Sequence, residues 1–297
     1  MRFATNGPNF PDELLVARDE GRVVFFCGAG VSRAKAGLRD FIGLAQDVAD
    51  RLSIPADNPA RQLIKAMEEF PSIPGVGSLI AADRVFGLIE RDYQSRDIHR
   101  AIAASLKPGD APDLSAHRVL LDLAKGPDGI VRLITTNFDL LFEDCDRTIP
   151  VSQQPRLPDP LRSQEFRGII HLHGMVAPDY TDAAGEGLII SSGEFGRAYL
   201  SDRWATDFIK TVLERFYVVF VGYSADDPPM QYLLEALNRS PGSYSGAYAL
   251  QSGSFEDAEA RWVQKGVRPI SVCNCFGILK IGPSSLKPTG AKTQLYY

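Results

Sequence analysis

The sequence predicts an α/β protein built on a parallel β-sheet with helices on both faces. Three observations support this prediction. Short, uninterrupted apolar runs recur along the chain, as expected for strands that are covered on both faces. Segments with helical periodicity separate these runs, which is the pattern of β-α-β units. Hydrophobic residues make up 44% of the 297 residues, enough for a substantial core.

The predicted strands are short and rich in β-branched and aromatic residues. They are Val23–Cys27, Ile130–Thr135, Gly168–Leu172, Phe216–Val221 and Ala247–Leu250. The predicted helices repeat apolar residues every three or four positions. They are Asp12–Asp19, Phe41–Leu52, Arg61–Glu69, Leu79–Asp92, Ala116–Ala124, Arg203–Glu214, Met230–Leu237 and Phe255–Lys265.

The domain organisation follows from where these patterns are missing. No convincing strand occurs between about residues 52 and 127, so we expect a helical insertion within one domain of residues 1–270. The segment Val151–Leu161 is rich in Pro and Gln and is expected to be an extended loop. Residues 271–297 are expected to form an irregular tail. The sequence leaves open whether this tail is a frayed end or the stump of a longer polypeptide.

Composition narrows the function classes. The net charge of −5 disfavours nucleic acid as the main partner of this domain. No apolar run approaches the roughly 20 residues that span a bilayer, and the N-terminal residues become polar too early for a secretion signal. We therefore expect a soluble, cytoplasmic protein without a membrane partner.

The cysteines do not indicate a zinc site. The chain has four, Cys27, Cys145, Cys273 and Cys275, and none shows the CxxC spacing of structural zinc ligands. Cys27 lies within an apolar run, where a buried small side chain is expected. Such low cysteine usage fits a reducing cytosol. We expect no bound metal.

The first candidate site segment is Gly28–Ser32, which follows the first predicted strand. Glycines at this position allow a tight turn and a close approach of backbone N–H groups to a phosphate. The third glycine of the full dinucleotide fingerprint is missing. Glycine at a strand-to-helix turn also serves packing, so this segment alone leaves nucleotide binding and simple packing open.

The second segment is Thr135–Asp139, directly after a strand. Its hydroxyl, amide and carboxylate groups are suited to gripping a ribose. The alternative is that Asn137 or Asp139 caps a helix beginning near Leu140. The strand end therefore predicts either a ligand contact or a helix cap.

The third segment, His171–Gly174, contains two of the four histidines of the chain. His171 and His173 are expected on the same face of the strand, because side chains alternate. The remaining ligands of a metal site are not evident, so a base that titrates near neutral pH is the better functional interpretation for His173. His171 is expected to be a structural histidine.

The fourth segment is Gly222–Ser224, again at a strand end. Gly222 permits a close backbone approach and Ser224 offers a hydroxyl. Asp226 and Asp227 precede two prolines, and for them a helix cap is favoured over catalysis.

Taken in order, these four segments resemble the sirtuin family. The matching residues are Gly28–Ser32, Thr135–Asp139, His173-Gly174 and Gly222–Ser224. The resemblance implies a Rossmann-like sheet with NAD lying across the strand ends as a consumed substrate. Asp40 and Phe41 also resemble part of the family's loop on the nicotinamide side.

The departures from the family are informative. Sirtuin deacylases carry two CxxC pairs after the His-Gly motif, whereas residues 175–194 contain no cysteine, so no zinc subdomain is expected. Thr136 replaces the usual Gln, Tyr223 replaces the usual Thr, and Ile42 stands where an Arg is usual. This combination resembles the zinc-free sirtuin-like NAD hydrolase domains of bacterial antiphage defence proteins.

The resemblance implies roles for individual residues. The expected catalytic residues are Asn137, which holds the ribose and a water molecule, and His173, which acts as base. The expected substrate-binding residues hold the phosphates, the riboses or the nicotinamide: Gly28, Ala29, Gly30, Ser32, Asp40, Phe41, Thr135, Asp139, Gly222 and Ser224.

The expected function is therefore cleavage of the nicotinamide–ribose bond of NAD by water, as a regulated effector of antiphage defence. Two alternatives stay open: a module that binds NAD or ADP-ribose without turnover, and an NAD-dependent protein deacylase. Since an unregulated NAD hydrolase is toxic, we expect control through a homo-oligomer or through a fused or separate sensor module. No cofactor is expected beyond NAD as substrate.

Overall fold

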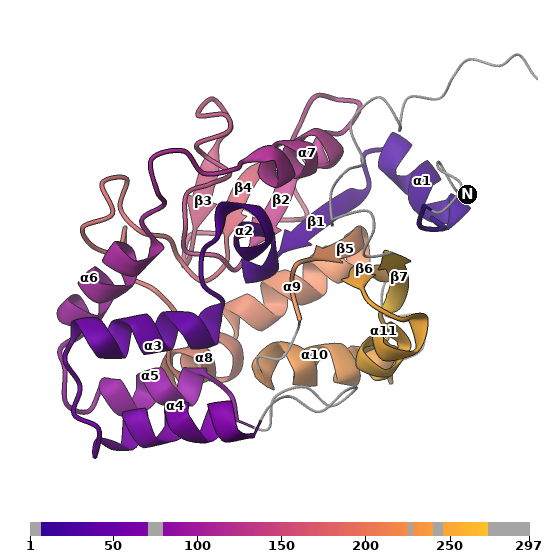
Figure 1. Cartoon of the computed structure of the whole chain (residues 1–297). Coiled ribbons are helices and arrows are strands. Elements are labelled where there is room, and N and C mark those ends of the chain that lie inside the picture. The colour runs from indigo at the N-terminus through magenta and orange to yellow at the C-terminus, as the bar shows by residue number, and fades with distance from the viewer. Residues whose placement is uncertain (1–6, 71–79, 225–227, 240–245, 273–297) are drawn as a thin grey trace, which may run out of the picture.

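The computed structural model describes residues 7–70, 80–224, 228–239 and 246–272. Its centre is a seven-stranded sheet with the order β3-β4-β2-β1-β5-β6-β7, in which every neighbouring pair is parallel (Figure 1). The strands are β1 (Val23–Cys27), β2 (Arg132–Thr135), β3 (Val151–Gln153), β4 (Gly168–His171), β5 (Tyr217–Val221), β6 (Ala247–Ser252) and β7 (Arg268–Val272). The predicted fold class, a Rossmann-like parallel sheet, is confirmed.

Helices cover both faces of this sheet, as predicted. The helices of the described residues are α1 (Asp12–Asp19), α2 (Ala29–Ala36), α3 (Phe41–Arg51), α4 (Pro59–Glu69), α5 (Asp83–Ile89), α6 (Ser95–Leu106), α7 (Ser115–Ala124), α8 (Ser192–Gly196), the π-helix η1 (Arg197–Ser201), α9 (Trp204–Arg215), α10 (Pro228–Asn238), α11 (Phe255–Trp262) and the 3₁₀-helix η2 (Val263–Lys265). No helix among these is long and apolar enough to cross a membrane.

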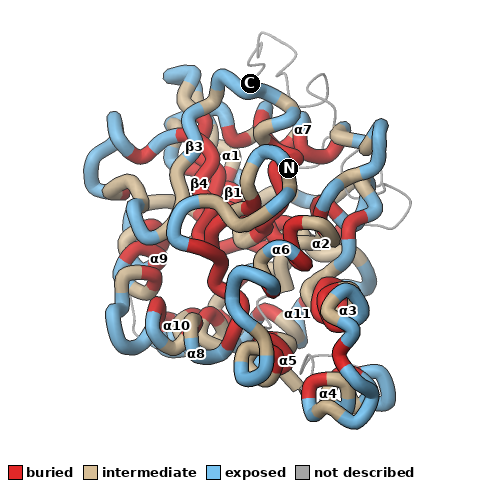
Figure 2. Tube along the Cα trace, turned by 90° about the vertical axis from the view of Figure 1, so that its left-hand side faces the viewer, coloured by how far each residue is buried: buried red, intermediate tan, exposed pale blue. Residues whose placement is uncertain are grey.

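Strand β1 shows how one apolar run serves two cores. Val24 and Phe26 point to the face that packs against α9, α10 and Trp262 of α11. Phe25 and Cys27 point to the opposite face, against α1, α2 and α7. All five residues of the strand are buried (Figure 2). A continuous apolar run is the signature of such a doubly covered central strand.

A third core lies beside the sheet and belongs to helices α3 to α6. Its buried residues include Leu44, Phe86 and Ile98, which pack together with Phe138 and Leu141 from the loop after β2. This helical group therefore supports the polar loop at the end of β2. The division of the chain into one domain of residues 1–270 with a helical insertion at about residues 52–127 stays a prediction.

Several elements differ from the predictions. The expected loop at Val151–Leu161 begins with β3, a three-residue edge strand with Val151 exposed, so backbone pairing with β4 rather than apolar content defines it. The helix expected near Leu140 is wrong, because residues 141–145 form turns. The structure also contains elements that the sequence pattern did not predict, namely α2, α6, α8, η1 and β7. Most of the tail expected at residues 271–297 lies outside the described residues.

Candidate functional site at the carboxyl edge of the sheet

The four predicted segments meet at one edge of the sheet. Without edge strand β3, the strand order corresponds to that of dinucleotide-binding domains, in which the chain reverses direction across the sheet between β1 and β5. The loops after these two strands flank that reversal point, and the loops after β2 and β4 lie beside them. In open parallel sheets, ligands bind in the crevice at such a point. The topology therefore places the candidate residues where a ligand is expected.

The glycines of the first and fourth segments touch each other. A Cβ added at Gly28 or Gly30 would come within 2.8 Å and 2.7 Å of Gly222 O, and one added at Gly222 would come within 2.5 Å of Val31 N. Gly222 also has a φ of +60°, a backbone angle that is unfavourable for residues other than glycine. The N–H of Gly30 donates to Gly222 O at 2.8 Å. Contact between two backbones thus explains these glycines, and it fixes the first turn of α2 against the end of β5.

Ser32 is the centre of a buried polar network. Its Oγ lies 2.9 Å from Asp139 Oδ2, 3.1 Å from Asn137 Nδ2 and 3.2 Å from His117 Nε2. When Ser32 donates to Asp139, it accepts from Asn137 and from the Nε2–H of His117, which uses the full capacity of a hydroxyl. Ser32 is only 1% exposed. The structure thus places this predicted phosphate ligand beneath the loop, where it holds Asn137 and Asp139.

Thr135 is also buried and also serves the loop. Its hydroxyl donates to Cys27 O at 3.2 Å and accepts from the N–H of Asn137 at 3.0 Å. The bonds join the end of β2 to the end of β1 and fix the backbone of Asn137. The predicted ribose contact of Thr135 stays a prediction, and its observed partners are all backbone groups.

Asn137 has one polar atom with no partner. Its Oδ1 is a buried acceptor without a hydrogen bond in the described part of the chain, whereas its Nδ2 donates to Ser32. Leaving a buried acceptor unsatisfied costs about 1–3 kcal/mol. Such an atom is suited to accept a hydrogen bond from a ligand hydroxyl or from water.

Asp139 is a buried carboxylate with a perturbed pKa. Burial raises the pKa of Asp139 to about 6, although hydrogen bonds from Ser32 and from the N–H of Leu141 oppose this effect. Asp139 therefore caps a turn, through the bond to Leu141, rather than the helix that was expected. Ionisable groups whose pKa is shifted by burial are typical of functional sites.

His173 is buried beside two aromatic residues. Its Nε2 lies 2.9 Å from the hydroxyl of Tyr199 in η1, and its ring packs edge-on against Phe195 of α8. Burial lowers the pKa of His173 to about 3. The imidazole is therefore neutral across the physiological range, with one nitrogen free of a proton.

His171 occupies the neighbouring position as a structural residue. Its Nδ1 lies 2.9 Å from Asn137 O and its Nε2 lies 2.7 Å from Glu143 Oε1. Side-chain alternation predicted that His171 and His173 share a face. Strand β4 ends at His171, so the alternation does not extend to His173. His171 contacts the loop after β2, whereas His173 contacts Phe195 and Tyr199.

The remaining predicted residues lie around this centre. Asp40 is the N-cap of α3, accepting from the N–H of Gly43 at 2.9 Å and pairing with Arg33 at 2.7 Å. Phe41 stacks on Phe86 at 5.2 Å. Asp40 is half-buried and has a structural role as a cap, which sequence pattern alone did not reveal.

Ala29 and Ser224 lie at the flanking loops and are partly exposed. The carbonyl of Ser224 accepts from Lys265 Nζ at 3.3 Å. Ala29 is the first residue of α2 and stands where a helix N-terminus faces the crevice. Asp226 and Asp227 lie outside the described residues.

Three residues of the site escaped sequence analysis: His117, Glu143 and Tyr199. His117 is fully buried, burial lowers its pKa to about 4, and its Nδ1 has no partner among the described residues. His117 lies on α7 within an ordinary amphipathic pattern, so nothing local marks it. Tyr199 lies in a π-helix, a type of turn frequent at functional sites but not readable from sequence.

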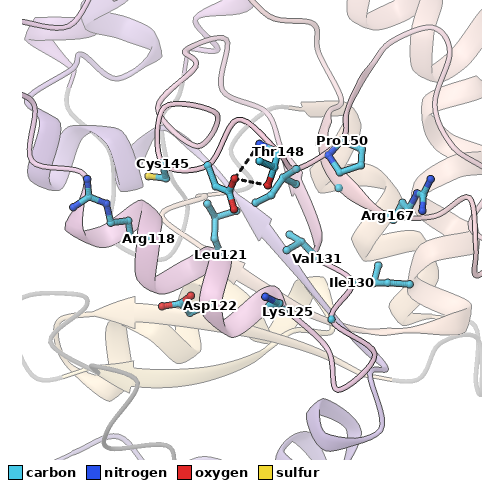
Figure 3. Close-up of a pocket in the computed structure, with 14 residues that line it drawn as sticks. Arg118, Leu121, Asp122, Lys125, Ile130, Val131, Cys145, Thr148, Pro150 and Arg167 are labelled. Atoms are coloured by element: carbon cyan, nitrogen blue, oxygen red, sulfur yellow. Dashed lines mark hydrogen bonds between the residues drawn. The ribbon is translucent and has the colours of Figure 1, made fainter.

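A cavity of about 450 Å³ lies away from this site (Figure 3). It is bounded by α7 and by the beginnings of β2 and β4, at the amino edge of the sheet. Arg118, Lys125 and Arg167 line it, but Figure 3 shows them spread around the rim rather than converging. The site chemistry lies at the carboxyl edge, so we do not assign the ligand to this cavity.

Among the described residues, no group of three or more His, Cys, Asp or Glu side chains is arranged to hold a metal ion. Cys27 is buried within β1, and burial raises the pKa of its thiol. Cys273 and Cys275 lie outside the described residues.

Residues 131–270 match the SIR2-like domain. The likeness to a SIR2-like domain is shown for this segment of the chain. The matched segment begins at β2, so it contains Asn137, Asp139, His173 and Gly222, whereas Gly28–Ser32 precedes it.

The uncharacterized protein y4cA of Sinorhizobium fredii is 32% identical over 290 residues, which cover 91% of this chain. The chain spans 22% of the length of that relative.

Two solved structures show remote likeness. A Sir2 homolog in complex with NAD is 14% identical, with 90% of each chain covered and a TM-score of 0.41. A mutant Sir2 homologue in complex with ADP-ribose is 15% identical, with 86% of this chain and 94% of that chain covered and a TM-score of 0.42. Likeness at this level does not identify the ligand of this chain.

Proposed function

We propose that the protein is an NAD hydrolase that cleaves the nicotinamide–ribose bond and releases nicotinamide and ADP-ribose. The observation that carries this proposal is the buried, unsatisfied Asn137 Oδ1 in a loop that Ser32 and Thr135 hold from below. A neutral histidine, His173, lies at the end of the next strand of the sheet. We propose that this acceptor for a ribose hydroxyl and this proton acceptor serve the same dinucleotide, because parallel strands end at one edge of the sheet.

The proposed reaction requires few catalytic groups from the protein. When the bond between nicotinamide and C1′ of the ribose breaks, its electron pair returns to the pyridinium ring, which leaves as neutral nicotinamide. No general acid is needed. Positive charge develops on the ribose, as in other glycoside cleavages. Water then adds to C1′ and loses a proton, so that the products are nicotinamide, ADP-ribose and one proton.

In this proposal, Asn137 Oδ1 accepts a hydrogen bond from a ribose hydroxyl or from the attacking water and fixes its orientation. His173 takes the proton. With a pKa of about 3 before substrate binds, His173 is a weak base, so the negative diphosphate of NAD is expected to make its protonation easier. Asp139 and Phe41 are proposed to contact the nicotinamide side. The amide groups at Gly28, Ala29 and Gly30, together with Gly222 and Ser224, are proposed to face the phosphates.

We further propose a cytoplasmic effector of antiphage defence that is controlled by a homo-oligomer or by a sensor module. Two points support this. The chain resembles zinc-free sirtuin-like effectors in its motifs, and its 32% identical relative is much longer than the aligned part, which leaves room for a further module. Control is required because free NAD hydrolysis depletes the cell.

The test is incubation of the purified protein with NAD and measurement of nicotinamide by chromatography. We expect release by the wild type and a loss of about a hundredfold or more in Asn137→Ala and His173→Ala, the usual range for removing a catalytic proton acceptor. His99→Ala is the matched control, because His99 lies on α6 outside the site network.

Each other outcome has a meaning. NAD binding without release would favour the sensor alternative. Release only in the presence of an acyl-lysine peptide would favour a deacylase. A protein that binds no NAD, measured by calorimetry, would refute the proposal.

A further inference from the structure

His171 joins the site loop to a carboxylate that is not part of the proposed chemistry. The imidazole is fully buried at the end of β4. One ring nitrogen lies 2.9 Å from the backbone carbonyl of Asn137, and the other lies 2.7 Å from Glu143 Oε1. The two partners belong to the same loop, which runs from the end of β2 to residue 143. Asn137 lies near its start and Glu143 lies at its end.

Both partners of the ring are acceptors. A backbone carbonyl has no proton to donate, and an ionised carboxylate has none either. Both ring nitrogens must therefore carry a proton for both contacts to be hydrogen bonds. When Glu143 acts as an acceptor, both contacts are made only by a buried imidazolium, and the side chain of Glu143 is itself only 15% exposed.

The charges around the ring favour this state. Burial alone lowers the pKa of His171, but the hydrogen bond and charge of Glu143 outweigh it and raise the pKa, with a smaller contribution from Asp139. The neighbouring strands place Thr135 and Gln153 beside His171, neither of which is ionisable. His117, the other histidine near Glu143, has a pKa lowered by burial to about 4 and is neutral.

We propose that charged His171 is a positioning residue that clamps the backbone of Asn137, so that the carboxamide of Asn137 is aimed at the substrate. This inference rests on the proposed NAD cleavage. Ser32 and Thr135 hold Asn137 through its side chain and its N–H, and His171 holds its carbonyl. Three groups thus fix one residue from three sides, which leaves Oδ1 as its open acceptor.

The decisive variant is Glu143→Gln. A glutamine amide can donate to a neutral His171 while the other ring nitrogen still donates to Asn137 O. The geometry is then kept without a charge. In the wild type, loss of the His171 proton instead places a lone pair against the Glu143 carboxylate. We therefore expect the wild type to lose kcat as the pH rises above the pKa of His171, and Glu143→Gln to lack this alkaline limb.

Two further variants complete the test. His171→Phe removes the donor to Asn137 O and is expected to lower kcat at least tenfold with a change in KM for NAD below threefold. Glu165→Gln, an exposed carboxylate that pairs with Arg162, is the control and should keep the wild-type pH profile. Thermal unfolding of each variant checks that the fold is intact.

A readout without substrate separates this inference from the proposed function. In ¹⁵N spectra at pH 7, both ring nitrogens of His171 should be protonated in the wild type and only one in Glu143→Gln. A neutral His171 in the wild type, or an unchanged alkaline limb in Glu143→Gln, overturns the positioning role alone. If the ring is doubly protonated but the wild type releases no nicotinamide, the proposed function fails and the positioning role in that reaction falls with it.

Discussion

Replacing Asp139 by asparagine is expected to stabilise the protein at neutral pH and to leave its stability unchanged at pH 4. The structure buries this carboxyl to 4% exposure, and burial raises its pKa from 3.8 to about 6. The folded state therefore binds the proton of Asp139 more tightly than the unfolded chain. The cost of ionising it is absent below about pH 4, grows as the pH rises, and is complete above about pH 6.

The magnitude follows from the same values. The difference between 3.8 and about 6 corresponds to about 3 kcal/mol, at about 1.4 kcal/mol for each pKa unit. Asparagine can keep both contacts, since its oxygen accepts from the N–H of Leu141 and its amide donates to Ser32. Ser32 then donates to His117, which changes tautomer. We expect part of the roughly 3 kcal/mol to be lost in this rearrangement, which leaves a gain of about 2 kcal/mol.

The assay is urea unfolding at pH 8 and at pH 4, with Asp57→Asn as an exposed control. A gain at pH 8 that disappears at pH 4 supports the burial argument. An equal effect at both pH values, or a loss at pH 8, would refute it. The variant should also cleave NAD more slowly, because a strained group kept at a site usually exchanges stability for activity.

Three further predictions follow from the geometry of the site. Gly222→Ala should lower the free energy of unfolding in urea by at least about 3 kcal/mol, since the added Cβ would lie 2.5 Å from Val31 N. The control Gly37→Ala, which has open space around the added Cβ, should lower it by about 1 kcal/mol. In ¹³C spectra, His173 should stay neutral down to pH 5 in both the wild type and Tyr199→Phe, because burial rather than the tyrosine lowers its pKa; a pKa above 6 in either protein would contradict this. Thr135→Val should cost about 1–3 kcal/mol in unfolding, because the N–H of Asn137 loses its acceptor, and a neutral effect would count against the loop-bracing role.

The fold was predictable because the central strands are continuous apolar runs in the sequence. Val23–Cys27 is apolar throughout, so both its burial and its bounds could be predicted without knowing any partner. Strand β3 shows the opposite case. Its three residues include an exposed valine and a glutamine, and only pairing with β4 makes them a strand. The helix expected near Leu140 failed for a related reason, since the loop is held by His171 and Tyr180 from distant segments.

The candidate site was predictable only in part. Residues at strand ends, such as Asn137 and His173, could be located because parallel strands bring their carboxyl ends to one edge. His117 could not, because it reaches Ser32 from a helix whose sequence looks like any amphipathic helix. Ser32 and Thr135 were predicted as substrate ligands, and the structure shows that their hydroxyls already have partners. The position of a motif indicates where a residue lies, but not whether its polar atoms bind a ligand or other groups of the protein.

The contact between the two glycine loops affects when the crevice can form during synthesis and folding of the chain. Gly28 and Gly30 are synthesised before Gly222. Their backbones meet only after β5 has joined β1. A nascent or truncated chain that ends before residue 222 therefore has no complete crevice, and the proposed NAD cleavage is expected only after β5 has paired with β1.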